Sequence, residues 1–231
     1  MRTPCLPGAQ AVFVHETPEE LSTAVAMRIA ELAARAIAAR GVFHIALAGG
    51  ETPRRCYEKL RKLVIDWAHI QIYFSDERCL PDSDAGRNDR MAHDALLKHV
   101  AIPSSNIHAI PAELGAYEAA TRYATVLTDI ERLDLVLLGM GEDGHTASLF
   151  PDNPATDSAA PVVPVFDAPK PPAERVSLGM NTLKAARHKI FLVTGAGKCK
   201  ALEQIALGKA LPAARVTDAE WHLDRATLPE S

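Results

Sequence analysis

The sequence lacks the features that mark several common classes of protein. Its four cysteines form no CxxC pair and are too few for a disulfide framework, so a zinc ribbon and a disulfide-stapled fold are both excluded, and a reducing compartment is favoured. No stretch approaches the roughly 20 apolar residues of a membrane span, and the N-terminus carries no apolar core of a signal peptide. We therefore expect a cytoplasmic protein that does not contact a membrane.

Positive charge is not in excess either. The chain has 25 Lys and Arg against 29 Asp and Glu, a formal net charge of −4, whereas binding to a nucleic-acid backbone needs a clustered surplus of cations. We expect no nucleic-acid partner, and an anionic small molecule would have to be held by a few local groups. The nine histidines form no HExxH or similarly spaced ligand set, so no metal is predicted.

What the sequence does contain is a regular alternation of helices and strands. Thr17 to Glu20 combines an N-cap, a proline at the first helical position and a glutamate three residues after the cap, which predicts a helix start. Helical spacing of apolar residues continues to Ile37, Gly41 ends the helix, and Val42 to Ala48 reads as a buried strand. The same alternation predicts helices at 54–63, 88–100, 117–132 and 198–207 and strands at 70–74, 133–138 and 189–193.

This order of elements predicts an α/β fold: a Rossmann-like, mainly parallel sheet with helices on both faces. No linker or repeat divides the 231 residues, so residues 1–231 are expected to form a single domain. Ligands bind such sheets beyond the carboxyl ends of the strands. Four predicted strands are followed by segments rich in glycine or charge, at 49–53, 75–78, 139–145 and 195–198.

Two of these segments are suited to binding an anion. Gly49 and Gly50 precede a helix with Pro53 near its start, so free backbone N–H groups and the helix dipole would favour a phosphate there. Gly195 to Lys198 repeats the geometry and adds a positive charge. It is not a Walker loop, because its glycine and hydroxyl positions do not match. The alternative for both segments is an ordinary glycine turn.

Residues 139–144 satisfy the pattern GxGxxG, which is typical of dinucleotide binding. That pattern should open a helix, yet Pro151 and Pro154 leave no room for one of ordinary length, so we reject this interpretation. What remains is His145, which could move protons near neutral pH, with Asp143 two residues earlier to orient it. A structural or solvated histidine is the alternative.

Residues 75–78 place three charges in a row after a predicted strand. We expect a loop here, because the segment is too polar for a buried strand. Arg78 could bind a phosphate or carboxylate through two hydrogen bonds. A solvated loop with local ion pairs is the alternative.

Together, these motifs and the run of residues 143–151, DGHTASLFP, resemble 6-phosphogluconolactonase. The resemblance covers nearly the whole chain, as far as Glu220 to Asp224. The lactonases belong to a larger group that includes glucosamine-6-phosphate deaminase. Deaminases carry an acidic residue where this chain has Phe150, and they lack the Ser-Asp-Glu-Arg segment, so the lactonase is favoured.

The resemblance implies a cofactor-independent enzyme that hydrolyses 6-phospho-D-glucono-1,5-lactone, the second step of the oxidative pentose phosphate pathway. It implies a general base, His145, with Asp143 to orient it and Arg78 near the lactone or the phosphate. The residues that it places on the substrate are Gly49, Gly50, Thr52, Asp76, Arg175 and Lys198. Glu51 departs from the family pattern, and its carboxylate would have to turn away from a phosphate.

Two other functions remain to be weighed. Aldose–ketose isomerisation with deamination would need an acidic proton-transfer residue at Phe150. A non-catalytic sugar-phosphate sensor would be expected to have lost Asp143 or His145 and to carry a binding extension, and the chain shows neither change. We therefore expect an enzyme whose partner is a sugar-phosphate lactone and which acts as a monomer.

Overall fold

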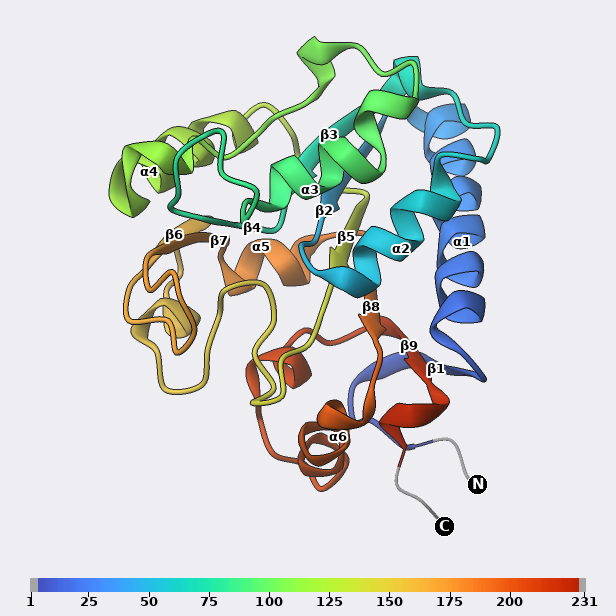
Figure 1. The fold of residues 1–231 in the computed structure, drawn as a ribbon, viewed down its shortest axis with the longest axis vertical. Helices are drawn as coiled ribbons and strands as arrows, with labels where there is room; N and C mark the ends of the chain where they lie inside the picture. The colour runs from blue at the N-terminus through green and yellow to red at the C-terminus, as the bar shows by residue number, and fades with distance from the viewer. Residues whose placement is uncertain (1–3, 229–231) are drawn as a thin grey trace.

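The structure, a computed structural model, describes residues 4–228, and its centre is a six-stranded parallel sheet (Figure 1). In spatial order the strands are β1 (Ala9–His15), β9 (Ala219–Asp224), β8 (His188–Val193), β5 (Leu135–Leu138), β2 (Phe43–Leu47) and β3 (Ile70–Phe74). A smaller antiparallel sheet has the order β4 (Asp76–Arg78), β7 (Arg175–Leu178) and β6 (Val162–Val165).

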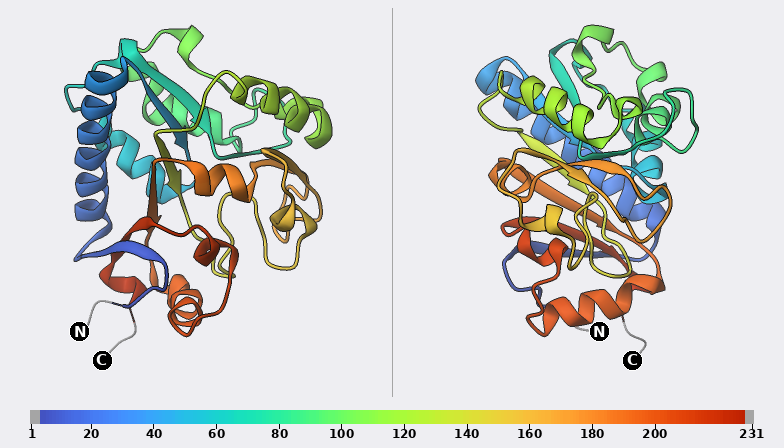
Figure 2. Two further views of the ribbon diagram at one scale, coloured as in Figure 1. Left: turned by 180° about the vertical axis from the view of Figure 1, so that it is seen from behind. Right: turned by 90° about the vertical axis from the view of Figure 1, so that its left-hand side faces the viewer.

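Helices cover both faces of the large sheet. They are α1 (Pro18–Arg40), α2 (Glu51–Leu60), α3 (Asn88–Ala95), α4 (Ala116–Leu127), α5 (Met180–Ala185) and α6 (Cys199–Ala206). Helices α1 and α2 lie on one side, whereas α5 lies on the other and α4 packs against β6 and β7 (Figures 1 and 2). The predicted fold class is therefore confirmed.

The predicted ends of α1 are also confirmed. The hydroxyl of Thr17 accepts a hydrogen bond from the N–H of Glu20 at 3.1 Å, and Gly41 closes the helix with a φ of 80°. Other helix ends differ. Helix α2 begins at Glu51 rather than at residue 54, because Gly50 is its N-cap, and α3 and α4 end earlier than predicted, at Ala95 and Leu127.

The large sheet changes direction of winding between β2 and β5. From β2 the chain passes through α2 to β3 on one side, whereas from β5 it moves to β8 on the other side. Because all these strands are parallel, their carboxyl ends meet at one edge, and a crevice opens where the connections diverge. The loops that follow β2 and β5 flank this crevice.

Ser75 joins the two sheets. Its N–H donates to the carbonyl of Leu47 at the end of β2, and its own carbonyl accepts the N–H of Leu178 in β7, both at 2.8 Å. The chain therefore leaves β3 and enters the small sheet without a free loop between them. This junction places β4 at the same edge as the crevice.

The expectation of a polar loop at residues 75–78 is wrong, because Asp76–Arg78 forms strand β4 with Asp76 and Glu77 buried. Their polarity is compatible with burial because hydrogen-bond donors surround both carboxylates. Glu77 accepts the backbone N–H groups of Arg78, Asn88 and Asp89 at 2.8, 2.7 and 2.8 Å, and thereby caps the start of α3.

Residues 4–228 lack two features. Within residues 4–228 no helix is both long and apolar enough to cross a membrane. In the same range no group of three or more His, Cys, Asp or Glu side chains is arranged to hold a metal ion.

A stack of aromatic rings joins β1 to β9. His15 Nε2 lies 3.0 Å from His222 Nδ1 with the two rings parallel, and Phe13 stacks on His222 at 4.8 Å between ring centroids. His222 is 5 % exposed. Burial, with the nearby charge of His15, lowers the pKa of His222 to about 4, although Glu220 opposes this shift.

We expect His222 to weaken the fold in acid. Unfolded His222 takes up a proton near pH 6.5 and the folded residue only near pH 4, so the free energy of unfolding should fall by roughly 1–3 kcal/mol as the pH drops between these values. Urea denaturation of wild type and His222→Gln at pH 8, 6.5 and 5 measures this. Glu77, whose pKa burial raises to about 7, acts in the opposite direction in both proteins. Equal pH dependence in the two proteins would exclude His222 as the cause.

Candidate active site

A cavity of about 220 Å³ opens at the crevice between the strand ends. It brings together seven of the nine residues that the sequence assigned to the site: Gly49, Gly50, Asp76, Arg78, His145, Arg175 and Lys198. They come from loops and strands far apart in the sequence, as a site at a parallel strand edge requires. Thr52 and Asp143 do not line this cavity, and each instead supports a residue next to it.

Asp143 holds the imidazole of His145. Its Oδ1 lies 2.6 Å from His145 Nδ1 and also accepts the backbone N–H of His145 at 3.1 Å. A Cβ on Gly141 would stand 2.0 Å from His145 Nδ1, so only glycine leaves room for the ring. With Nδ1 occupied by Asp143, Nε2 is the ring nitrogen left for a ligand.

The charge state of Asp143 suits this supporting role. Burial alone would raise its pKa, but the hydrogen bonds from His145 and the positive charge that His145 can carry lower it to about 2. Asp143 is therefore ionised at neutral pH. An ionised carboxylate can only accept a hydrogen bond, so it is paired with an Nδ1–H of the ring and leaves Nε2 facing away from it.

Tyr57 of α2 anchors the loop after β2. The Tyr57 hydroxyl accepts the N–H of Ala48 at 2.9 Å and donates to the Ala48 carbonyl at 2.8 Å, and the side chain is fully buried. Gly50, the N-cap of α2, provides no side-chain cap, so the first turn keeps N–H groups for a ligand. Glu51 turns outward and pairs with Arg54 and Arg55, as its position required.

Two contacts fix the loop after β8. Thr52 bonds Thr194 through their hydroxyl groups at 2.6 Å, which ties the loops after β2 and β8 together. The carboxylate of Asp224, at the end of β9, accepts the N–H of Gly195 at 3.0 Å. These contacts place Lys198 beside the cavity. They also make Thr52 a residue that positions a loop, a role that its motif alone could not distinguish from direct binding of a ligand.

Cations dominate the wall of the cavity. Arg78 and Arg175 are direct cross-strand neighbours in β4 and β7, where like charges repel. Arg78 Nε is buried and has no hydrogen-bond partner among residues 4–228. Burial lowers the pKa of Arg175, and the charge of Arg78 adds to this effect against that of Asp76.

Lys170 is a further cation that the sequence did not reveal. It lies in the loop between β6 and β7 and lines the cavity, as Lys198 does. Burial and the charge of Lys170 lower the pKa of Lys198, whereas Glu142 and Asp143 oppose this shift. The loop is anchored to the site because Arg175 donates to the carbonyls of Lys170 and Pro172 at 2.8 and 3.1 Å. Four cations thus face only two carboxylates around the cavity, an arrangement that an anion would stabilise.

The rest of the wall includes an acidic side chain and an uncharged polar side chain that are bonded to each other. Asp76 accepts hydrogen bonds from Ser148 at 2.6 Å and from the side-chain amide of Asn88 at 3.2 Å. Asn88 also lines the cavity and was missed, because nothing in its sequence surroundings distinguishes it from an ordinary residue at a helix start.

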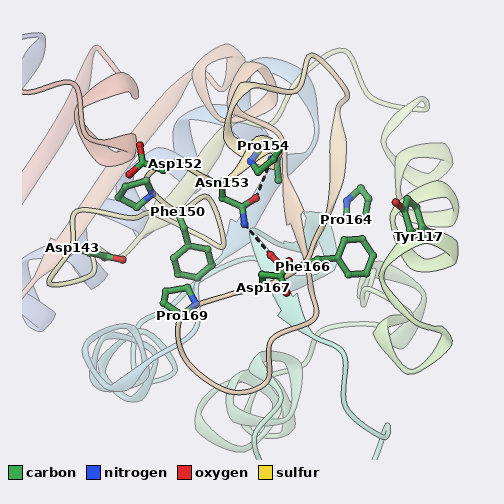
Figure 3. A pocket seen from close by; sticks show the side chains of 12 residues that line it. Tyr117, Asp143, Phe150, Asp152, Asn153, Pro154, Pro164, Phe166, Asp167 and Pro169 are labelled. Carbon is green, nitrogen blue, oxygen red and sulfur yellow. Dashed lines mark hydrogen bonds between the residues drawn. The ribbon is translucent and has the colours of Figure 1, made fainter.

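Phe150 forms an apolar partition behind His145. Its ring centroid lies 4.5 Å from that of His145, and the Arg175 guanidinium carbon lies 5.5 Å from the ring centroid. Beyond it lies a second cavity of about 660 Å³, which Phe150 and Asp143 border on one side and Phe166 and Tyr117 on the other (Figure 3). The ring therefore separates His145 from this neighbouring space.

The chain is similar to known proteins of one family. A family model described as glucosamine-6-phosphate isomerases/6-phosphogluconolactonase matches residues 16–224. A probable chloroplastic 6-phosphogluconolactonase 3 of Oryza sativa subsp. indica is 36% identical over 215 residues, which are 84% of this chain and 64% of that protein, so the chain spans just under two thirds of its length. The 6-phosphogluconolactonase of Synechocystis sp. is 37% identical over 187 residues, 77% of each chain.

A solved structure shares the architecture. The crystal structure of 6-phosphogluconolactonase from Thermotoga maritima superposes with a TM-score of 0.87 at 27% identity, covering 93% of this chain and 99% of that one. These matches confirm the resemblance that the motifs indicated. They leave the cytoplasmic location a prediction, since the rice relative is named as chloroplastic.

The anchoring of the loop after β2 can be tested through Tyr57. Tyr57→Phe leaves the N–H and carbonyl of Ala48 without their partner in a buried position, so we expect a loss of about 1–3 kcal/mol in the free energy of unfolding. Tyr117→Phe is the matched control, because Tyr117 is 71% exposed, and its change should stay within about 0.5 kcal/mol. Chemical denaturation measures both, and similar losses in the two variants would contradict the anchoring role.

Proposed function

The chain belongs to the family of glucosamine-6-phosphate isomerases and 6-phosphogluconolactonases, and we propose that it hydrolyses 6-phospho-D-glucono-1,5-lactone to 6-phospho-D-gluconate. One observation carries the proposal: the imidazole of His145, backed by Asp143, shares a small cavity with four cationic side chains. Such a cavity suits a substrate that carries a phosphate at one end and an ester at the other.

The phosphate is held by the cations and the glycine loop. Lys198, Lys170 and Arg175 supply charge, and the first turn of α2 supplies N–H groups after Gly50. Because the phosphate is remote from the lactone carbonyl, its binding energy positions the reacting end against His145. This explains how a protein with a net charge of −4 selects an anion.

His145 acts as a general base through Nε2. It removes a proton from a water molecule as the water oxygen bonds to the lactone carbonyl carbon, and Asp143 stabilises the imidazolium that results. Arg78 steadies the negative charge that develops on the carbonyl oxygen. When the bond from the carbonyl carbon to the ring oxygen breaks, the imidazolium returns the proton to that oxygen, which restores His145.

The surroundings of Phe150 favour hydrolysis over isomerisation with deamination. The deaminase reaction needs an acidic proton-transfer group at this position, and the buried ring that packs against His145 offers none. An apolar wall instead keeps the imidazole away from the neighbouring cavity.

Replacement of His145 tests the mechanism. We expect His145→Ala to lower kcat by about 10²–10⁴-fold, because general base catalysis is lost. The assay follows the disappearance of enzymatically generated 6-phosphogluconolactone above its spontaneous hydrolysis. His93→Ala, a change to an exposed histidine of α3, is the control and should keep full activity. If wild type does no better than buffer, the function is wrong, whereas an active His145→Ala variant would discard only the mechanism.

The phosphate grip can be tested separately. We expect Lys198→Ala to raise KM for 6-phosphogluconolactone about 10–100-fold, and Lys170→Ala to raise it less, because each removes a charged hydrogen-bond donor. Neither variant should change hydrolysis of the unphosphorylated lactone. Lys62→Ala, at an exposed position outside the cavity, provides the control. A loss of the same size on both lactones would show that these lysines do not bind the phosphate.

A further inference from the structure

Asn88 is a firmly fixed polar group on the cavity wall. Its backbone N–H donates to Glu77 Oε1 at 2.7 Å, and its side-chain Nδ2 donates to the carbonyl and Oδ1 of Asp76 at 3.0 and 3.2 Å. The residue is only 5% exposed, yet it lines the cavity. Asp76 therefore holds the side-chain amide in one orientation through its carbonyl and its carboxylate, whereas Glu77 fixes the backbone.

That orientation leaves the amide oxygen as an acceptor for a ligand. Among residues 4–228 no group donates to Asn88 Oδ1. This oxygen is not fully enclosed by protein, so it is open to the cavity that Asn88 lines. It lies against Gly49, where an added Cβ would stand 1.9 Å from it. The first glycine of the loop after β2 thus makes room for Asn88.

An oxygen acceptor selects its ligand by charge. A phosphate oxygen would be repelled both by Asn88 Oδ1 and by the neighbouring carboxylate of Asp76, whereas a hydroxyl group can donate to either. The cations at the cavity already supply what a phosphate needs. The hydroxyl groups on the ring of a sugar lactone supply the hydrogen-bond donor that Asn88 Oδ1 lacks.

We infer that Asn88 Oδ1 accepts a hydrogen bond from a ring hydroxyl of the substrate, which makes Asn88 a specificity-determining residue. The inference rests on the proposed function. Asp76 is then a positioning residue for the amide, with Ser148 bonded to its other oxygen at 2.6 Å. This hydroxyl contact fixes the rotation of the ring, which the phosphate contacts at one end leave free.

A comparison of substrates with and without each hydroxyl tests the contact. The phosphorylated lactones that lack the hydroxyl at C2, C3 or C4 are assayed beside 6-phosphogluconolactone with wild type and Asn88→Ala. We expect the variant to lose about tenfold in kcat/KM on the full substrate but to be unchanged on the one deoxy lactone that cannot make the bond. Wild type should prefer the full substrate over that deoxy lactone, and this preference should disappear in Asn88→Ala.

Two further variants separate recognition from folding. Asn88→Ser keeps a residue that is favourable at a helix start, but its side chain is too short for the hydroxyl to reach the ligand. It should therefore behave as Asn88→Ala does. Ser148→Ala removes a donor to Asp76 from a side chain that is buried outside the cavity, and it should affect all lactones by the same factor. Equal losses on every lactone in the Asn88 variants would overturn the inference, whereas a wild type inactive on all of them would overturn the proposed function itself.

Discussion

The hydrogen bond between Asp143 and His145 depends on a loop that closes tightly after β5. Within it, Gly141 donates to the carbonyl of His145 at 2.9 Å and receives the N–H of Gly144 at 3.0 Å, so the chain doubles back on itself. Because a side chain at Gly141 would occupy the place of the imidazole, glycine there is a condition for the whole site. The pattern GxGxxG, rejected as a dinucleotide motif, thus has a different physical purpose: it seats a histidine at a strand end.

The loops around this histidine keep their positions through buried tyrosines. Tyr57 bonds both the N–H and the carbonyl of Ala48 just after β2, and Tyr123 of α4 accepts the N–H of Phe74 at 2.8 Å and donates to its carbonyl at 3.4 Å, at the end of β3. Sheet hydrogen bonds end at these points, and an unpaired buried backbone group would be costly. A hydroxyl brought from a helix completes the pairing and fixes the direction in which each loop leaves the sheet.

The sequence predicted the parts of the fold that local signals govern. Caps such as Thr17 and Gly41 and the apolar strands β2, β3, β5 and β8 were found because each is encoded by adjacent residues. Strand β9 was not, because Glu220 and Asp224 look solvent-exposed until Arg28 and the N–H of Gly195 are brought to them. The polar strand β4 was missed for the same reason.

The site shows the same division. Residues within glycine-rich motifs could be named in advance, whereas Lys170 and Asn88 reach the cavity only through the pairing of β4 with β7 and the docking of α3, neither of which leaves a local signal.

The arrangement of charge around the cavity follows from this convergence. Arg78 opposes Arg175 in the small sheet, and Lys170 and Lys198 both line the cavity and repel each other, so separate elements bring like charges together there. A dianionic phosphate would relieve this repulsion in surroundings where water screens charge less than in bulk solvent. The acceptors Asp76 and Asn88, contributed by β4 and α3, cannot share that ligand. A substrate that satisfies both sets would therefore carry its phosphate and its hydroxyl groups at different ends, as the proposed lactone does.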